Sequence, residues 1–135
     1  MKNHSIRMRH AAISSITLFF LLLNFAYVPS AKADGHQSYK VPFKLHTGKR
    51  RFEKNCSSCH GVWADGTDQG PPLLHRFYVP SHHGDEAFFR AIKQGVKQHH
   101  WSFGDMQPVP GVRDKDAKSI VSFLRWLQRE SGLIK

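Results

Sequence analysis

The hydrophobic residues of this chain fall into three segments with helical spacing, and the clearest is residues 113–130. Its apolar positions recur every three or four residues, which places them on one side of a helix. They are Ala117, Ile120, Val121, Leu124 and Leu127, with Phe123 and Trp126 at the flanks. Acidic residues near the start and arginines near the end match the dipole of such a helix. Arg113 precedes the helix but is a poor N-cap, so we expect Asp114 to take over that role.

Two further segments show weaker patterns of the same kind. Residues 84–96 repeat apolar positions at helical spacing, carry acidic residues in the first turn and have Gly95 near their end. Residues 46–61 place Phe52 among many charged positions, and Thr47 is the expected N-cap there. No useful stretch alternates in the manner of a strand, so the predicted fold class is all-α.

Glycine and proline punctuate the residues between the predicted helices, at 62–81 and 97–112. They predict two long irregular loops. Structureless loops of about 20 residues are uncommon in a compact domain unless they have something to wrap. The loops therefore indicate a large ligand.

The N-terminal residues have a different pattern, a basic start followed by a mostly apolar run. Residues 1–10 contain three basic residues and no acid, residues 11–28 are mostly apolar, and Ala31-Lys32-Ala33 supplies small residues. This order is typical of a secretory signal peptide, here cleaved before Asp34. The alternative is an uncleaved membrane anchor, although residues 11–28 span only roughly 27 Å against a hydrocarbon core of about 30 Å. We predict a signal peptide at residues 1–33 and one domain, exported to the periplasm, at residues 34–135.

The charge of the chain bears on its partners. Four of the 20 basic residues and none of the 10 acidic ones precede Asp34, so the formal charge falls from +10 to +6 on cleavage. A surplus of this kind favours acidic partner surfaces and steers encounters with them. A basic surface that only maintains solubility is the alternative. Nucleic acid is not expected as a partner outside the cytoplasm, and a membrane is expected only if the N-terminal segment stays uncleaved.

Both cysteines of the chain stand in one short motif, Cys56-Ser-Ser-Cys59-His60. A disulfide between residues so close would form a strained ring, and a thioredoxin-like dithiol needs a βαβ context that this sequence lacks. C-x-x-C-H is the attachment signature of haem c. Thiols on adjacent turns add across the two vinyl groups of one porphyrin, and His60 then falls where its Nε2 can bind the iron. We predict one covalently bound haem c on Cys56 and Cys59, with His60 as an iron ligand.

The sixth iron position decides what such a haem does. If a side chain closes it, the iron only exchanges electrons; if it is open, the iron binds or activates a small molecule. Met106 is the only methionine beyond residue 33, and it lies in a loop held by glycine and proline. We expect it to be the sixth ligand, with His99 or His100 as the alternative.

These residues carry a resemblance to class I c-type cytochromes, and most of all to small bacterial mono-haem members. The stretch "GKRRFEKNCSSCHG" is similar to the N-terminal helix and haem motif of that family. "FGDMQPV" resembles its distal methionine loop, and "SIVSFLRWLQ" its C-terminal helix. The resemblance covers nearly all of residues 47–130. It implies a cytochrome c fold, with three to four helices and long loops wrapped around one covalently bound haem.

The resemblance also implies roles for particular residues around the iron. His60 and Met106 would be its axial ligands. "GPPL", residues 70–73, matches the loop in which a proline carbonyl, here that of Pro71, orients the histidine through Nδ1–H. One departure is Gln107, which separates Met106 from Pro108, whereas the methionine of the family is usually followed directly by proline.

A further implication concerns the core. Where the first and last helices cross, Gly48 and Phe52 would pack against Phe123 and Leu124. A glycine at the crossing would let the two backbones approach closely.

We therefore expect an electron-transfer protein and not an enzyme, carrying one electron on a haem with histidine and methionine ligation. One alternative is a haem enzyme or small-ligand sensor with a weak or open sixth position. Another is a dedicated electron-accepting subunit of a periplasmic dehydrogenase. Four basic residues close to the attachment motif either guide docking onto an acidic partner or are simply the solvated face of the first helix. They are Lys49, Arg50, Arg51 and Lys54.

Histidine is unusually frequent beyond residue 33, with the pairs His82-His83 and His99-His100. A second metal site is one interpretation. The other is that they are polar loop residues near the haem propionates, because side chains of adjacent histidines diverge. Trp101 is expected to form a wall of the haem pocket together with Phe103.

Overall fold

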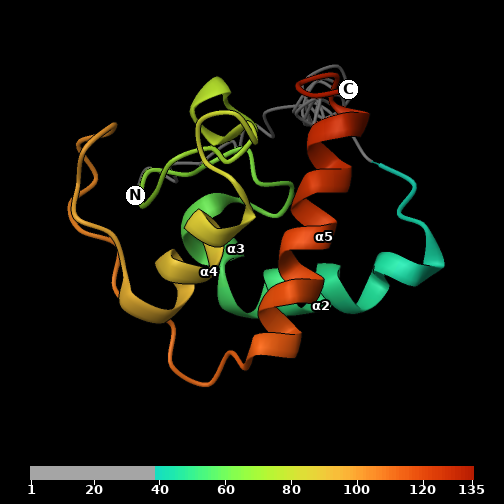
Figure 1. Ribbon diagram of the computed structural model, residues 1–135, viewed down its shortest axis with the longest axis horizontal. Helices are drawn as coiled ribbons and strands as arrows, with labels where there is room; N and C mark the ends of the chain where they lie inside the picture. The colour runs from blue at the N-terminus through green and yellow to red at the C-terminus, as the bar shows by residue number, and fades with distance from the viewer. Residues whose placement is uncertain (1–38) are drawn as a thin grey trace, which may run out of the picture. The chain divides into compact units, whose positions relative to one another are not determined.

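Four α-helices and two 3-10 turns make up the regular structure of residues 39–135, the part that the computed structural model describes (Figure 1). The predicted signal peptide or anchor lies outside these residues. The elements are η1 (Phe43–Leu45), α2 (His46–Asn55), α3 (Ser57–His60), η2 (Arg76–Tyr78), α4 (Asp85–Gln94) and α5 (Asp114–Glu130). Pairing of the strand type in this part of the chain is limited to one antiparallel bridge, between Val96 and Met106. The all-α prediction is confirmed. No helix within residues 39–135 is long and apolar enough to span a bilayer.

The core lies where α5 crosses α2 (Figure 1). Phe52 of α2 and Phe123 of α5 are fully buried, with ring centroids 5.7 Å apart. A Cβ on Gly48 would lie 2.9 Å from the Cβ of Phe123 and closer still to the carbonyl oxygen of Ser119. Glycine therefore sets how near the helices come, and the predicted packing of Gly48 and Phe52 on Phe123 is confirmed. Leu124 belongs to the same buried cluster.

The apolar stripe predicted for α5 is buried along its whole length. The start of the helix differs from the expectation, because Asp114 is its first residue and does not cap it. The carboxylate of Asp114 instead pairs with Lys93 of α4 at 2.8 Å. Arg113 occupies the N-cap position without a capping bond, and its guanidinium donates to Asp116 at 3.0 Å. The two aspartates of the first turn thus form ion pairs, Asp114 with α4 and Asp116 with the N-cap residue of its own helix.

The first predicted helix is two helices in the structure. Cys56, with φ −130°, separates α2 from α3. The prediction of Thr47 as N-cap is wrong. The helix begins two residues earlier than that cap requires, at His46, because η1 leads directly into α2 and places Leu45 at the cap. Thr47 lies inside the first turn, where its hydroxyl accepts a hydrogen bond from Arg50 at 3.4 Å.

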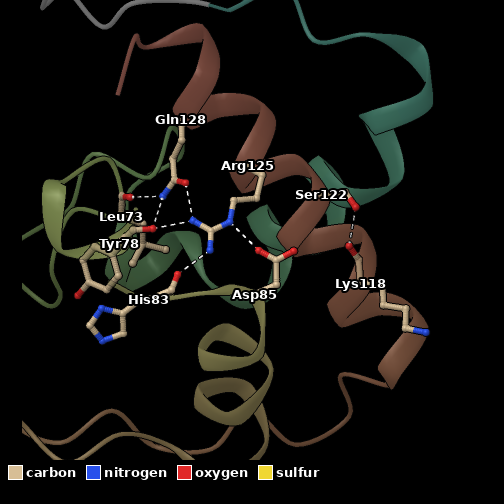
Figure 2. A network of polar contacts seen from close by, with 8 residues as sticks. All are labelled: Leu73, Tyr78, His83, Asp85, Lys118, Ser122, Arg125 and Gln128. Atoms are coloured by element: carbon tan, nitrogen blue, oxygen red, sulfur yellow. Dashed lines mark hydrogen bonds and ion pairs between the residues drawn. The ribbon is translucent and has the colours of Figure 1, made fainter. Parts of the chain in front are cut away.

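A buried polar network ties α5 to the loop before α4, and no pattern in the sequence indicates it (Figure 2). Arg125 and Gln128 are buried, at 6% and 0% exposure. The Arg125 guanidinium donates to four oxygens at 2.6–2.7 Å: Tyr78 O, His83 O, Asp85 Oδ1 and Gln128 Oε1. Gln128 Nε2 donates to the carbonyls of Leu73 and Tyr78, each at 3.1 Å. A buried charge needs such complete pairing, so this network fixes residues 73–85 on α5.

Candidate functional site

A cavity of about 480 Å³ lies among α2, α3, α4, α5 and both long loops. Most of its lining is apolar, from Phe52 of α2 to Ile120 and Leu124 of α5. Four of the predicted site residues line it: Cys56, His60, Pro71 and Met106. Cys59, the fifth, is exposed and is not among the lining residues. The structure therefore gathers most of the predicted site around a single hollow.

His60 is the last residue of α3, and its ring is held in one orientation. Its Nδ1 lies 2.8 Å from the carbonyl oxygen of Pro71. A carbonyl only accepts, so Nδ1 carries the proton and donates it, and the lone pair is on Nε2. Burial lowers the pKa of His60, opposed by the weaker effect of the Pro71 hydrogen bond. The site thus holds a neutral imidazole with Nε2 free to bind a metal.

Two glycines bring Pro71 to His60. Gly61 ends α3 with φ 78°, in the left-handed region that glycine adopts without strain. A Cβ on Gly70 would lie 3.0 Å from both the Cβ and the carbonyl oxygen of Cys59. The loop is therefore drawn tightly against α3 just before Pro71.

Cys56 and Cys59 are one helical turn apart and are not joined to each other. Burial, followed by the nearby Cys59, raises the pKa of Cys56 to about 12. Exchange with disulfides requires the thiolate, so this environment is opposite to that of a redox-active dithiol. It is compatible with sulfur that forms thioethers.

Met106 is fixed at the base of a loop excursion, residues 97–105, that leaves α4 and returns (Figure 1). Both bonds of the bridge between Val96 and Met106 are 2.9 Å long. Gly95, with φ 74°, lies directly against the Met106 carbonyl, where a Cβ would clash. After Gln107 the chain returns to α4 through a 2.8 Å bond from Val109 N to Ile92 O. The inserted Gln107 therefore leaves Met106 at the cavity.

Trp101 and Phe103 line the cavity, as expected of its walls. The indole Nε1 of Trp101 is buried and makes no hydrogen bond of good geometry among residues 39–135, although the Tyr78 hydroxyl lies near enough to interact with it. A buried donor of this kind calls for an acceptor, and a propionate carboxylate of a haem is one. Together with the apolar lining, it fits the cavity to a haem.

Residues that the sequence analysis did not assign to the site complete the lining. Leu73 and Tyr78 come from the loop that the Arg125 network holds. Ile120 and Leu124 belong to the stripe of α5, so helical spacing identifies them as buried without showing that they face a ligand. For Tyr78 no sequence signal exists.

The four basic residues near the motif do not form one free surface. Lys49 pairs with Glu53, and its ammonium lies 5.2 Å from the ring centroid of Trp63. Arg51 pairs with Asp116 at 3.2 Å. Arg50 and Lys54 are exposed. The structure thus divides the four into two that form ion pairs within the chain and two whose side chains are exposed to solvent.

The two histidine pairs meet in space although they lie in different loops. His82 Nε2 is 3.1 Å from His100 Nε2, and the ring of His83 is 5.8 Å from that of His99. Partial burial, followed by the neighbouring imidazoles, lowers the pKa of His100. His83, His99 and His100 also line the cavity.

Two cysteines one turn apart, a histidine with a free Nε2 and an apolar cavity containing a methionine define a c-type cytochrome. A family model described as "Cytochrome c" matches residues 45–128, and the chain belongs to this family. No curated protein and no solved structure matches it. The predicted family, cytochrome c fold and covalently bound haem c are confirmed, and with them a role in haem-based electron transfer. Membership of the class I mono-haem group stays a prediction.

Proposed function

We propose that this cytochrome is a periplasmic carrier of single electrons, not an enzyme, with one haem whose iron is held by His60 and Met106. The observation that carries the proposal is the position of Met106. The Val96 bridge and the close contact with Gly95 fix its backbone at the cavity that His60 also lines. A thioether that occupies the sixth position excludes other ligands and favours ferrous iron.

The haem supplies the change between ferrous and ferric iron, and the chain supplies the rest. Cys56 and Cys59 would hold the group covalently, so that it is not lost in a dilute compartment. Pro71 keeps the proton of His60 on Nδ1, which leaves Nε2 for the iron. The apolar lining limits water at the iron, which disfavours the more highly charged oxidised site.

The test is the near-infrared absorption of the oxidised protein. We expect the charge-transfer band of an iron–thioether bond in the wild type. In Met106→Ala the band should vanish, and the haem should gain the ability to bind cyanide when oxidised and carbon monoxide when reduced. Gln107→Ala, which alters the exposed neighbour, is the matched control and should keep the band.

Two results would contradict the proposal. A wild type that lacks the band and binds carbon monoxide readily has an open position and is a sensor or enzyme. A wild type that lacks the band yet excludes carbon monoxide has His99 or His100 as its sixth ligand, since both line the cavity.

Export and docking complete the proposal. Residues 1–33 would direct export and be removed before Asp34, which mass spectrometry of protein from the periplasmic fraction checks directly. The surplus of positive charge in residues 34–135 would favour redox partners with acidic surfaces. A dedicated dehydrogenase partner is compatible with this proposal, because a carrier and an accepting subunit use the same haem chemistry.

A further inference from the structure

Imidazoles from two separate loops face one another beside the haem cavity, and we propose that His82, His83 and His100 bind a divalent transition-metal ion. Neutral imidazole is a ligand for zinc, copper and nickel. The site is distinct from the haem iron. It goes beyond the proposed electron-carrier function and rests on it in one respect, because His100 must be free of the haem iron.

The distances between the ring nitrogens suit a common metal ion. One nitrogen from each of the three rings lies within 4.8 Å of the others. His82 Nε2 and His100 Nε2 are already 3.1 Å apart. Metal–nitrogen bonds of about 2.0–2.1 Å place two ligands roughly 2.9 Å apart at a right angle and roughly 3.3 Å apart in a tetrahedron. The pair therefore has the spacing of two ligands, and the third nitrogen, within 4.8 Å of both, would have to move closer to complete the set.

Adjacent histidines alone make a poor metal site because their side chains diverge, and the fold overcomes this by adding a ligand from a second loop. His82 and His83 alone diverge, but His100 approaches both of them from the excursion after α4. Its ring centroid is 5.1 Å from that of His82 and 5.3 Å from that of His83. The ligands thus come from both sides of the ion, 17 or 18 positions apart along the chain.

Phe77 orients two of the three rings. His83 Nδ1 donates to the carbonyl oxygen of Phe77 at 2.5 Å, so the proton is on Nδ1 and the lone pair on Nε2. Metal-binding histidines are commonly held by a hydrogen bond of this kind to their second nitrogen. The ring of Phe77 stacks on His100, with centroids 4.2 Å apart and planes 17° apart.

The loop that carries His82 and His83 is held from behind by α5. Arg125 donates to the carbonyl oxygens of Tyr78 and His83, each at 2.6 Å. Figure 2 shows the carbonyl of His83 directed at Arg125 while its imidazole points away from it. The backbone of the site is therefore fixed independently of any metal.

The loop that carries His100 is closed across its base. Asp105 accepts from Lys97 Nζ at 2.5 Å and from Gln98 N at 3.0 Å. Gln98 Oε1 in turn accepts from Gly104 N at 2.6 Å. Rigid loops on both sides lower the cost of bringing the three rings to one ion.

His82 is exposed and does not line the haem cavity, whereas His83 and His100 do. The ion would thus lie in the cavity wall, open to solvent on the His82 side. Solvent access provides both an entry path and water molecules to complete the coordination.

The experiment uses tag-free protein with its haem attached and oxidised. Equilibrium dialysis against Zn²⁺, followed by elemental analysis, should give one zinc per haem iron. His82→Gln and His100→Gln should each weaken binding at least about 100-fold, because even indirect partners of a metal ligand are typically worth 10- to 100-fold. His46→Gln removes a histidine whose ring contacts Val41 O, outside the cluster, and should bind zinc as the wild type does.

Copper provides a second readout. In the Irving–Williams order Cu²⁺ binds more tightly than Zn²⁺ to the same nitrogen ligands, so it should displace zinc. Its electron paramagnetic resonance spectrum should show coupling to three imidazole nitrogens, and to two in His82→Gln. All proteins in the copper experiment, including the reference protein, carry His36→Gln. Cleavage before Asp34 would make His36 the third residue of the chain, and an N-terminus with histidine at the third position itself binds copper.

The haem Soret spectrum and the thermal midpoint of each variant establish that it is folded. Folded His82→Gln or His100→Gln that binds zinc with wild-type affinity would overturn the proposal. So would a wild type that holds less than one zinc per iron at saturation, or copper coupled to a single nitrogen. The near-infrared band of Met106 ligation is recorded in the same samples. Failure of the metal site therefore cannot be confused with failure of the electron-carrier function.

Discussion

At the scale of single residues, two glycines allow close backbone contacts, one at the helix crossing in the core and one at the methionine loop, by leaving no room for a side chain. Gly48 lets α2 approach α5, and Gly95 lets the chain pass against the carbonyl of Met106. Only Gly95 also has a positive φ, 74°, so a substitution there combines backbone strain with a clash. The position of the proposed iron ligand therefore depends on a residue of the cavity lining that has no side chain.

Gly95→Ala should weaken the iron–methionine bond. A Cβ would press on the Met106 carbonyl and lie 3.1 Å from Pro108, so the loop must shift. We expect a weaker near-infrared band and a lower reduction potential. Gly104→Ala is the matched control, because Gly104 also has a positive φ, 88°, but nothing within 4 Å of a Cβ. It should lose only about 1–2 kcal/mol of stability to backbone strain and keep the band. Near-infrared bands of equal intensity in Gly95→Ala and Gly104→Ala would contradict the role of Gly95 in positioning Met106.

At the scale of elements, α5 organises the site through its polar residues as much as through its apolar stripe. Arg125 and Gln128 fix the loop before α4, and Asp116 joins α5 to α2 through Arg51. Each contact links segments that are far apart in the chain. Loss of one partner therefore affects an interface between elements and not only one helix.

Arg125→Met should destabilise the protein strongly. It retains much of the side-chain volume but removes the donor to the His83 carbonyl, the Asp85 carboxylate and Gln128 Oε1, while the Tyr78 carbonyl keeps only the bond from Gln128. Breaking a buried ion pair costs about 3–5 kcal/mol, and we expect the lower figure because Asp85 is 58% exposed. Arg129→Met, at an exposed position of the same helix, should cost less than about 1 kcal/mol. Urea unfolding of both variants tests this, and similar midpoints would contradict it.

Asp116 should make the free energy of unfolding depend on pH in the acidic range, because its carboxylate joins α2 to α5. Its hydrogen bond from Arg113 and the charges of Arg113, Arg51 and Lys115 lower its pKa, against partial desolvation. The carboxylate therefore stabilises the fold above its unfolded pKa of about 3.9, and this contribution is lost as pH falls through the lower folded pKa. Between about pH 5 and 2, the free energy of unfolding should fall less steeply in Asp116→Asn than in the wild type. Urea titrations at several pH values measure the slope, with Asp68→Asn in an exposed loop as control. Parallel slopes for wild type and Asp116→Asn would refute the assignment.

At the scale of the whole molecule, we expect the surplus of positive charge and the exposed side chains of α2 to guide encounters with redox partners. Of the four basic residues near the haem motif, Arg50 and Lys54 face solvent, while Lys49 and Arg51 are paired within the chain. A docking surface built on α2 therefore depends on Arg50 and Lys54.

Electron transfer from a small anionic reductant such as hexacyanoferrate(II) should slow as salt rises. Screening shortens from about 30 Å at 0.01 M to about 8 Å at 0.15 M ionic strength, which weakens steering by the net positive charge. Lys54→Glu should lower the rate at low salt more than Lys135→Glu, which changes the net charge equally at the C-terminus. Stopped-flow kinetics measure both. Equal effects would show that overall charge, and not the exposed face of α2, guides the encounter.

Local chemistry explains which features were predictable. The C-x-x-C-H motif indicates haem c because covalent attachment needs only neighbouring residues, and the stripe of α5 predicts a helix because its period is local. The start of α2 was mispredicted, since the 3-10 turn η1 before it has no distinct pattern. The contact between His60 and Pro71 followed from family resemblance and not from any property of the residues themselves.

The sequence by itself therefore determined the covalent haem, the all-α class and the histidine and methionine available for the iron. Only the tertiary structure decided which of the remaining histidines lie together. His82 and His83 meet His100 because Arg125 fixes one loop and the Val96–Met106 bridge closes the other. Such encounters depend on the path of the chain between distant residues, and a one-dimensional pattern of polar and apolar positions does not encode that path.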